Sequence, residues 1–346
     1  MHAALWATMK KYNISTNLIR VIKNLYDKAT SAILFNSRIG DWFRTTVGVR
    51  QGCLLSPTLF NIILERITTD ALEDHEGTVS IRGRTITNLL FADDIDGLAE
   101  EEEELAKLVE LLDKASTAYG IEISAEKTKL MTNNTSGINT EIKVNGQKLE
   151  TVTSFKYLGS VITDEGSKPE ILSKISQTTP ALTGLKPVWI DKSISLSPKI
   201  QMMHSLVTSI FLYACESWIL TAELQRRIQA LELRCYSKIL RISYKDYVTN
   251  GQVRAKVQQA TGPHEDLPTI VKRRKLQWYG HVSHSVGLAK TISQGRVKEA
   301  RRQRRQRKRW EDNIREWTGL EFAKSQRAVE NRTKWRKLVA KSSVVP

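Results

Sequence analysis

Two consecutive carboxylates stand inside an otherwise apolar stretch of this chain, in the tetrapeptide Phe91-Ala92-Asp93-Asp94. Burying such a pair is costly unless cations balance it, so the backbone is expected to turn there and leave both acids outside. Residues 87–91 and 95–99 have the composition of short strands, which predicts a hairpin with the acids at its tip. Carboxylates so placed suit a Mg²⁺ ion, and a solvated acidic turn without any ligand is the alternative interpretation.

The bulk composition predicts a folded chain. With 346 residues and 40% hydrophobic content, it can bury a core and form two or three domains. Its three cysteines, Cys53, Cys215 and Cys235, are too few and too widely spaced for a disulfide framework or a zinc site. No signal-peptide pattern is visible, and the longest apolar stretch falls short of the ~20 residues that span a bilayer. We therefore expect an intracellular protein, nuclear or cytoplasmic, that is neither secreted nor membrane-bound.

Positive charge is concentrated at the carboxyl end. Residues 272–346 hold 22 Lys and Arg against six Asp and Glu, an excess that equals the whole formal charge of +16. The densest run, in which seven of nine residues are basic, comprises Arg301, Arg302, Arg304, Arg305, Arg307, Lys308 and Arg309. Such density predicts salt-sensitive binding to nucleic-acid phosphates, with a nuclear localisation signal as a second use. The nearby Trp310, Trp317 and Trp335 either stack on bases or are buried on one side of helices.

Periodicity places helices on both sides of the acidic turn. Ser56 is expected to cap a helix that Pro57 opens, and glutamates 100–104 are expected to start another, because negative charge is favoured at a helix amino terminus. Residues 167–250 have a mainly helical pattern. Residues 251–268 are polar and contain a Gly-Pro pair, which predicts a linker.

The acidic turn belongs to an ordered series of motifs. Arg50-Gln51-Gly52 and Ser56-Pro57 precede it, and residues 120–129 and the pentapeptide Phe155-Lys156-Tyr157-Leu158-Gly159 follow it. This series resembles the reverse transcriptase of non-LTR (LINE-type) retrotransposons. The resemblance implies an α+β fold, in which a partial polymerase palm of antiparallel sheet and helices is followed by a helical thumb and a basic helical carboxyl-terminal region.

The resemblance also implies a division into domains. These are a palm remnant (1–135), a primer-grip hairpin (136–165), a helical thumb (166–250), the linker (251–268) and a basic nucleic-acid-binding region (269–346). In such polymerases a first metal-binding aspartate lies upstream of the helix that corresponds here to residues 3–11, and no residue of this sequence matches it. The expectation is therefore an amino-terminally truncated palm without fingers and with impaired catalysis.

Roles for individual residues follow from the same resemblance. Asp93 and Asp94 are the expected catalytic, metal-binding pair, and Lys127 is the expected lysine near the triphosphate, unless it is simply solvated at a strand edge. The expected contacts to template and incoming nucleotide come from Arg50, Gln51, Gly52, Phe91 and Ala92. For Arg50 to Gly52 the alternative is an ordinary loop before a capped helix. The pentapeptide 155–159 is the expected primer grip, and a plain hairpin with a glycine corner is its alternative.

The activity that the resemblance implies is RNA-directed DNA polymerisation. Its partners would be an RNA template, a DNA primer and dNTPs, and its cofactor Mg²⁺, or Mn²⁺ in its place, with no small-molecule cofactor and no membrane. The competing function is that of a non-catalytic relic which still binds nucleic acid.

Overall fold

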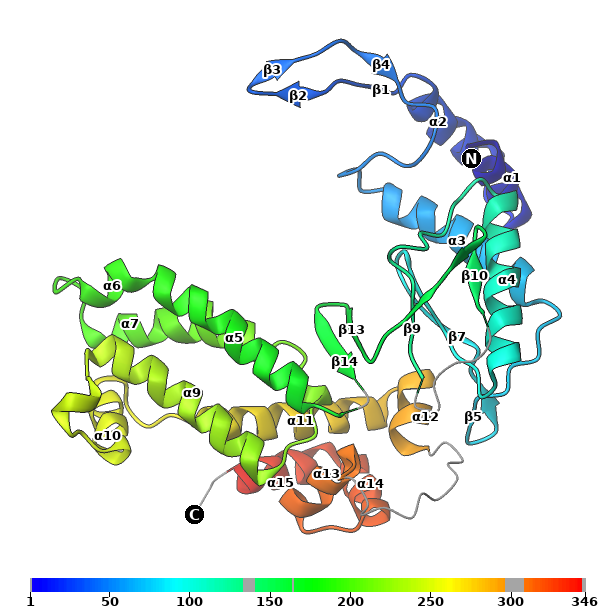
Figure 1. The fold of residues 1–346 in the computed structure, drawn as a ribbon. Helices are drawn as coiled ribbons and strands as arrows, with labels where there is room; N and C mark the ends of the chain where they lie inside the picture. The colour runs from blue at the N-terminus through cyan, green and yellow to red at the C-terminus, as the bar shows by residue number, and fades with distance from the viewer. Residues whose placement is uncertain (1, 133–140, 164, 296–307, 344–346) are drawn as a thin grey trace. The chain divides into compact units, whose positions relative to one another are not determined.

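The computed structural model describes residues 2–132, 141–163, 165–295 and 308–343, which form two compact units (Figure 1). The first unit covers Met1–Val152 and the second Thr153–Pro346. The first unit combines helices with short strand pairs. The second begins with one strand pair and continues as helices, so the chain has a mixed α+β fold.

In its described residues the first unit is built from four helices and short strands. Its helices are α1 (His2–Lys11), α2 (Thr16–Asp27), α3 (Ser56–Leu72) and α4 (Glu102–Ala118). Its strands are β1 (Thr30–Ser31), β2 (Leu34–Phe35), β3 (Arg38–Ile39), β4 (Phe43–Arg44), β5 (Ser80–Ile81), β6 (Arg84–Thr85), β7 (Asn88–Phe91), β8 (Asp94–Gly97), β9 (Lys129–Leu130), β10 (Lys143–Val144), β11 (Gln147–Lys148) and β12 (Glu150–Thr151). Among the described residues these strands join only in pairs, all antiparallel except β9 with β12.

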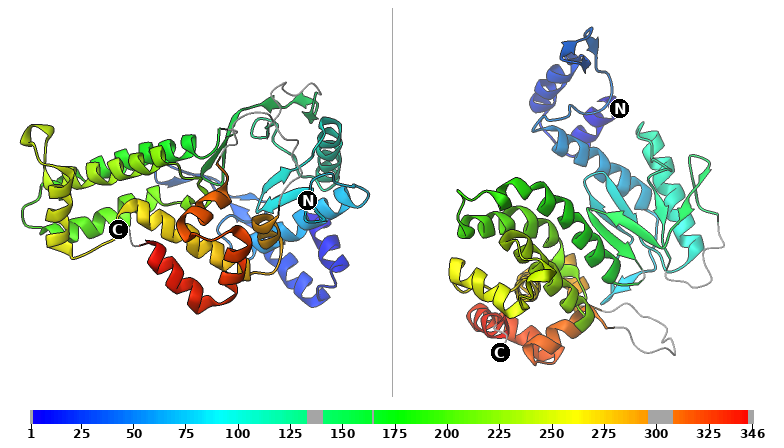
Figure 2. Two further views of the ribbon diagram at one scale, coloured as in Figure 1. Left: turned by 90° about the horizontal axis from the view of Figure 1, so that it is seen from below. Right: turned by 60° about the vertical axis from the view of Figure 1, so that its left-hand side comes forward.

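Helices α3 and α4 pack against each other in the first unit (Figure 2), and their residues Ala71 and Leu108 share a hydrophobic cluster with Ile95 of the acidic hairpin. The predicted glutamate-rich start is confirmed, since three glutamates lie in the first turn of α4. Leu108 is fully buried and Gly120, at φ 70°, follows the end of the helix. Helix α4 contacts α3, β8 and β10.

The second unit begins with a hairpin and continues as helices. The hairpin consists of β13 (Ser154–Tyr157) and β14 (Ser160–Thr163). The helices are α5 (Lys168–Gly184), α6 (Lys186–Ile190), α7 (Leu196–Met202), a π-helix η1 (Met203–Thr208), α8 (Ser209–Phe211), a 3₁₀ turn η2 (Cys215–Ser217), α9 (Ala222–Leu240), a 3₁₀ turn η3 (Tyr244–Asp246), α10 (Asn250–Thr261), α11 (Leu267–His284), α12 (Leu288–Gln294), α13 (Trp310–Thr318), α14 (Phe322–Glu330) and α15 (Arg332–Ser343).

The prediction of a linker at residues 251–268 is wrong, because helix α10 occupies most of that range. Val253 and Val257 of this helix are buried and join the core formed by α5 to α9. Thr249 and Gln252 form a capping box at its start, which satisfies backbone donors that a linker would leave to water. Polar composition was a poor guide here because two valines suffice to fix a short helix on a larger core.

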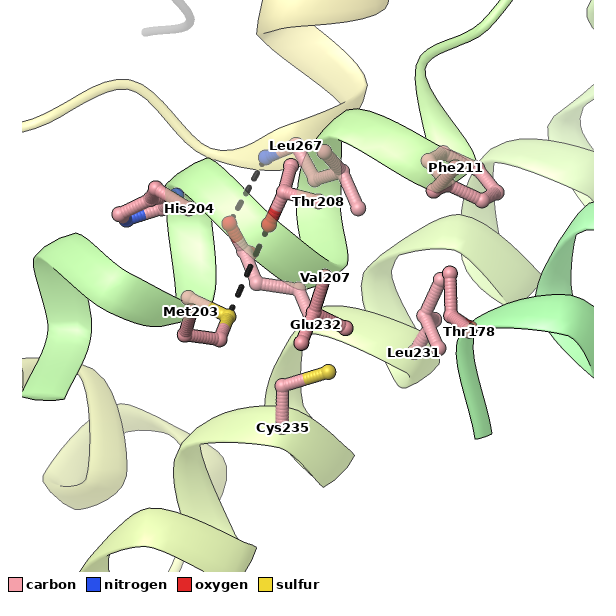
Figure 3. A pocket seen from close by; sticks show the side chains of 10 residues that line it. All are labelled: Thr178, Met203, His204, Val207, Thr208, Phe211, Leu231, Glu232, Cys235 and Leu267. Atoms are coloured by element: carbon pink, nitrogen blue, oxygen red, sulfur yellow. Dashed lines mark hydrogen bonds between the residues drawn. The ribbon is translucent and has the colours of Figure 1, made fainter. Parts of the chain in front are cut away.

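A buried acid, Glu232, links α9 to the start of α11. Its Oε1 accepts a hydrogen bond from the Leu267 backbone N–H at 2.8 Å, and Arg254 Nη2 lies 3.5 Å from its Oε2. The carboxylate borders a cavity of about 10 Å³ whose lining also includes Met203 and Thr208 of the π-helix (Figure 3). Burial raises the pKa of the Glu232 carboxyl to about 7.

This shifted pKa predicts a specific pH dependence of stability. Between pH 4.5, the ordinary value for glutamate, and pH 7, the folded chain keeps a proton that the unfolded chain has released. Raising the pH through this window should therefore destabilise the second unit, by up to about 3 kcal/mol. Glu232→Gln should remove this dependence, as measured by urea unfolding at pH 5 and pH 8 followed by tryptophan fluorescence. Glu223→Gln, an exposed glutamate on the same helix, is the matched control. If Glu232→Gln shows the same difference in free energy of unfolding between pH 5 and pH 8 as the native chain, the assignment to Glu232 is contradicted.

Candidate active site

The acidic turn forms the tip of the β7–β8 hairpin, as the sequence predicts. Phe91 pairs with Asp94 and Asn88 with Gly97, so Ala92 and Asp93 make a two-residue connection between the strands. Ala92 has φ 52°, in the left-handed region that side chains with a Cβ avoid. Such a backbone persists only where the surrounding structure enforces it, and it is common at functional sites.

The base of this hairpin is fixed, whereas its tip is exposed. The Leu98 N–H donates to Thr87 O at 2.8 Å and extends the ladder beyond the two strands. A Cβ added to Gly97 would lie 3.1 Å from the Leu108 side chain, so glycine lets β8 approach α4 closely. Ile95 packs against the cluster that contains Leu108. The helix thus sets the position of the turn through the strands.

Asp93 and Asp94 are both exposed at the tip, next to Phe91, whose side chain is 60% exposed. Their oxygen atoms are the ligand type that Mg²⁺ prefers, and Mg²⁺ sites in proteins often use one or two carboxylates together with substrate phosphates. Within the described ranges no group of three His, Cys, Asp or Glu residues could hold a metal ion. The pair therefore fits Mg²⁺ as part of a ligand set that nucleotide oxygens would extend.

The loop at residues 50–52 is held by the start of α3. Gly52 has φ 81°, a conformation that favours glycine, and Arg50, Gln51 and Gly52 are all exposed. The Ser56 hydroxyl donates to Arg50 O at 2.6 Å. Ser56 is therefore not the helix cap that the sequence predicted, because its hydroxyl bonds the preceding loop and Leu55 occupies the cap position. This hydrogen bond still connects the loop to the helix, although it is not a capping contact.

Lys127 lies in a turn just before β9 and its side chain is exposed. The next residue, Thr128, closes this turn with a backbone hydrogen bond to Ser124 O at 3.0 Å. Its neighbour Lys129 pairs with Glu150 at 2.8 Å. Lys127 is thus on the surface of the first unit, where both the triphosphate role and the solvated role remain compatible with its setting.

The pentapeptide 155–159 lies in the second unit. Its strand pairs Ser154 with Thr163 and Tyr157 with Ser160, and Leu158 and Gly159 form the turn with φ 46° and 80°. Lys156 and Leu158 are exposed, while Phe155 and Tyr157 are partly buried. The structure therefore confirms a hairpin with a glycine corner, and the primer-grip role stays a prediction.

The basic run is only partly covered by the structure, since Arg301, Arg302, Arg304, Arg305 and Arg307 lie outside the described residues. Lys308 forms an ion pair with Glu316, and the Arg309 backbone N–H donates to Asp312 Oδ2 at 2.7 Å. The described end of the basic run is therefore attached to the acidic residues of α13.

The three carboxyl-terminal tryptophans belong to the core. Trp335 is buried, with its indole N–H donating to Leu276 O at 3.1 Å, and Trp310 donates to Glu216 O at 2.8 Å. Trp317 packs against the same cluster. One-sided burial is thus the interpretation of these side chains that the structure supports.

Sequence reasoning missed several buried polar groups, among them Lys275 and the pair of Glu170 and Lys174. Lys275, counted above among the basic residues, is fully buried and donates to Trp218 O at 2.6 Å and Asn313 Oδ1 at 3.1 Å. Glu170 and Lys174 form a buried ion pair beneath the β13–β14 hairpin. A weak signal exists for the second, since residues four apart lie on one helix face, but the sequence does not show that this face is covered.

No helix in the described part of the chain is both long and apolar enough to cross a membrane.

Comparison with known proteins points to one family. Residues 1–162 match the family model described as reverse transcriptase (RNA-dependent DNA polymerase). A transposon-derived protein of Caenorhabditis elegans is 26% identical over 207 residues, which are 59% of this chain and 74% of that protein. The Pol polyprotein from the type-1 retrotransposable element R2 of Nasonia vitripennis is 27% identical over 48% of this chain and 17% of its own length.

A third relative, the Pol polyprotein from the type-2 retrotransposable element R2DM of Drosophila melanogaster, is 27% identical over 127 residues. The match covers 36% of this chain and 12% of that polyprotein, so the chain spans a small part of the R2 polyproteins. The motif series, the β7–β8 hairpin and these matches agree. The match of residues 1–162 and the named relatives support a reverse transcriptase of the non-LTR retrotransposon type.

Proposed function

We propose that this chain is the palm and thumb part of an RNA-directed DNA polymerase, with Asp93 and Asp94 as its metal-binding, catalytic pair. The observation that carries the proposal is the pair of exposed carboxylates at the tip of a supported hairpin, within residues that match the reverse transcriptase model. Its substrates would be dNTPs and the 3′ end of a DNA primer paired with an RNA template.

The residues of the first unit would divide the work at the reacting end. Asp93 and Asp94 would hold Mg²⁺ or Mn²⁺, and the bound ions would activate the primer hydroxyl and stabilise charge on the leaving pyrophosphate. Phe91, Ala92 and the loop of Arg50, Gln51 and Gly52 would support template and incoming nucleotide, because these residues are exposed and glycine permits a close backbone approach. Lys127 would place its positive charge near the triphosphate.

The second unit would hold the nucleic acid. Residues 155–159 would contact the primer end, the helices within residues 166–250 would act as the thumb, and the basic residues 301–309 would attract phosphates by releasing counterions. This last interaction predicts hybrid binding that weakens steeply as salt concentration rises.

Polymerisation by this chain should be slow. The described residues supply two adjacent acids and no third ligand beside them. Neighbouring residues near a strand point to different sides, so Asp94 does not replace a carboxylate arriving from another strand. The same observation favours the second candidate, a non-catalytic member of the family that binds nucleic acid.

Single-nucleotide incorporation separates the two candidates. The purified chain is mixed with a labelled DNA primer on an RNA template, one complementary dNTP and Mg²⁺ or Mn²⁺, and hybrid binding is measured in parallel. We expect slow incorporation that depends on the metal and stops with EDTA. Tight, salt-sensitive binding without any metal-dependent incorporation would establish the non-catalytic candidate. Failure to bind the hybrid would refute both.

A further inference from the structure

The two carbonyl groups of the turn at the tip of the β13–β14 hairpin accept hydrogen bonds from a residue of α5 and from a residue that follows α8. The Tyr213 hydroxyl donates to Leu158 O at 2.8 Å, and Lys174 Nζ donates to Gly159 O at 2.7 Å. Tyr213 lies 55 residues beyond Leu158 in sequence. A turn in an isolated hairpin would leave these carbonyls to water, so here its position is set from outside the hairpin.

A buried ion pair reinforces this attachment from below. Glu170 Oε2 accepts the Val161 N–H at 2.6 Å, and Lys174 Nζ lies 3.7 Å from Glu170 Oε1. The side chains of both partners are about 5% exposed. Burying two charges is costly unless further hydrogen bonds satisfy them. Both partners find these bonds on the backbone of the hairpin, so removing either would loosen the turn.

Tyr213 also contacts both the lysine and the turn through its ring. The ammonium of Lys174 lies 4.7 Å from the centre of the Tyr213 ring, which is within the range of a cation–π contact. Gly159 has φ 80°, and a Cβ there would lie 3.3 Å from the same ring. The ring therefore packs against the turn while its hydroxyl holds the turn's carbonyl.

We propose that Glu170, Lys174 and Tyr213, here called the turn clamp, are positioning residues that hold the Leu158-Gly159 turn in place for the 3′ end of the primer. This inference rests on the proposed function, because it takes the primer-grip role of residues 155–159 as given. The clamp contacts no reacting atom. It makes the placement of the primer end depend on helix α5 and on the chain after α8, so that the hairpin and these helices act as one body.

The second unit contains a suitable control. Lys199 is also buried and also donates to backbone carbonyls, those of Trp189 and Asp191. These carbonyls lie at the carboxyl end of α6, in its last turn and its cap, and not in the hairpin. Lys174→Met and Lys199→Met therefore remove the same kind of buried donor, and only the first removes it from the turn. Tyr213→Phe removes one hydroxyl and leaves the buried pair intact.

The test is photo-crosslinking of a DNA primer that carries 4-thiothymidine at its 3′ end and is annealed to RNA. The crosslinked peptides of the full chain are identified by mass spectrometry, at hybrid concentrations that give equal binding. We expect the native chain to crosslink within residues 154–161. Lys174→Met and Tyr213→Phe should each lower that crosslink about fivefold or more, as expected for a lost hydrogen bond, while Lys199→Met keeps it. Equal loss of thermal stability in the two lysine variants would show that stability alone does not move the crosslink.

The outcomes distinguish this inference from the function on which it rests. A native crosslink at the hairpin that stays unchanged in Tyr213→Phe and Lys174→Met would overturn the turn clamp and leave the polymerase proposal standing. A chain that binds the hybrid but crosslinks only elsewhere would overturn the primer-grip role and the clamp together. If Lys174→Met does not fold, the Tyr213→Phe result decides alone, since its exposed hydroxyl is dispensable for the core.

Discussion

Asp93→Asn should reduce metal-dependent nucleotide incorporation to background, a loss of about 100-fold or more wherever the native signal allows it to be measured. The amide keeps the size of the side chain and the turn, but it removes the negative charge that would hold a divalent ion. Because Asp93 lies at the exposed tip and not in the core, its replacement should leave the affinity for the RNA–DNA hybrid within about twofold. Primer extension and fluorescence anisotropy, run on the same preparations, measure the two quantities.

Asp96→Asn is the matched control for this result. Asp96 lies in β8, pairs with Leu89 and is partly buried, so it shares the strand but not the turn. We expect little change in incorporation for this variant. An equal loss in both variants would mean that charge on the strand, and not a ligand at the tip, supports the reaction. Native activity that survives Asp93→Asn would remove the catalytic role altogether.

Asn313→Ala should destabilise the second unit by about 4 kcal/mol, because it leaves several buried polar groups without partners. Asn313 is fully buried, and its side chain accepts the Leu220 N–H and donates to Leu220 O, both at 2.8 Å. Its Oδ1 also accepts from Lys275, whose ammonium lies 4.5 Å from the centre of the Trp310 ring. Burial lowers the pKa of this lysine to about 6, because removal from water disfavours its charged form.

Urea unfolding followed by tryptophan fluorescence measures this loss, since six of the eight tryptophans lie in the second unit. Asn331→Ala serves as the comparison, because the side chain of the exposed Asn331 accepts the Lys334 N–H at the start of α15. Removing such a cap should cost about 1 kcal/mol. If Asn313→Ala costs no more than Asn331→Ala, the buried network does not hold the carboxyl-terminal helices to the rest of the unit.

Local patterns predicted the parts of the site that depend on neighbours in sequence. The strands around Asp93 and Asp94 follow from apolar residues interrupted by two acids, and α4 follows from its glutamates and its apolar face. The conformation of Ala92 did not follow, since nothing in the letters Phe-Ala-Asp-Asp marks a left-handed alanine. That conformation belongs to the two-residue connection between β7 and β8.

Contacts between distant segments could not be predicted from one sequence. The residues next to Lys275 in sequence do not distinguish it from an exposed basic residue. Only its hydrogen bond to Asn313 in the folded chain reveals that it belongs to a buried polar network. The turn clamp likewise joins segments up to 55 residues apart. The cap of α10 was different, because Thr249 and Gln252 carry the known spacing of a capping box and could have argued against a linker.

The buried lysines of the second unit change how the chain's strong basicity is to be understood. Lys174, Lys199 and Lys275 point their amines at main-chain oxygens inside the protein, where no phosphate can reach them. Their hydrogen bonds stabilise the fold. The net charge counted from the composition therefore overstates the positive charge that a bound polynucleotide contacts. The attraction must then come from a smaller set of surface cations, and the ionic-strength sensitivity of binding reports that set alone.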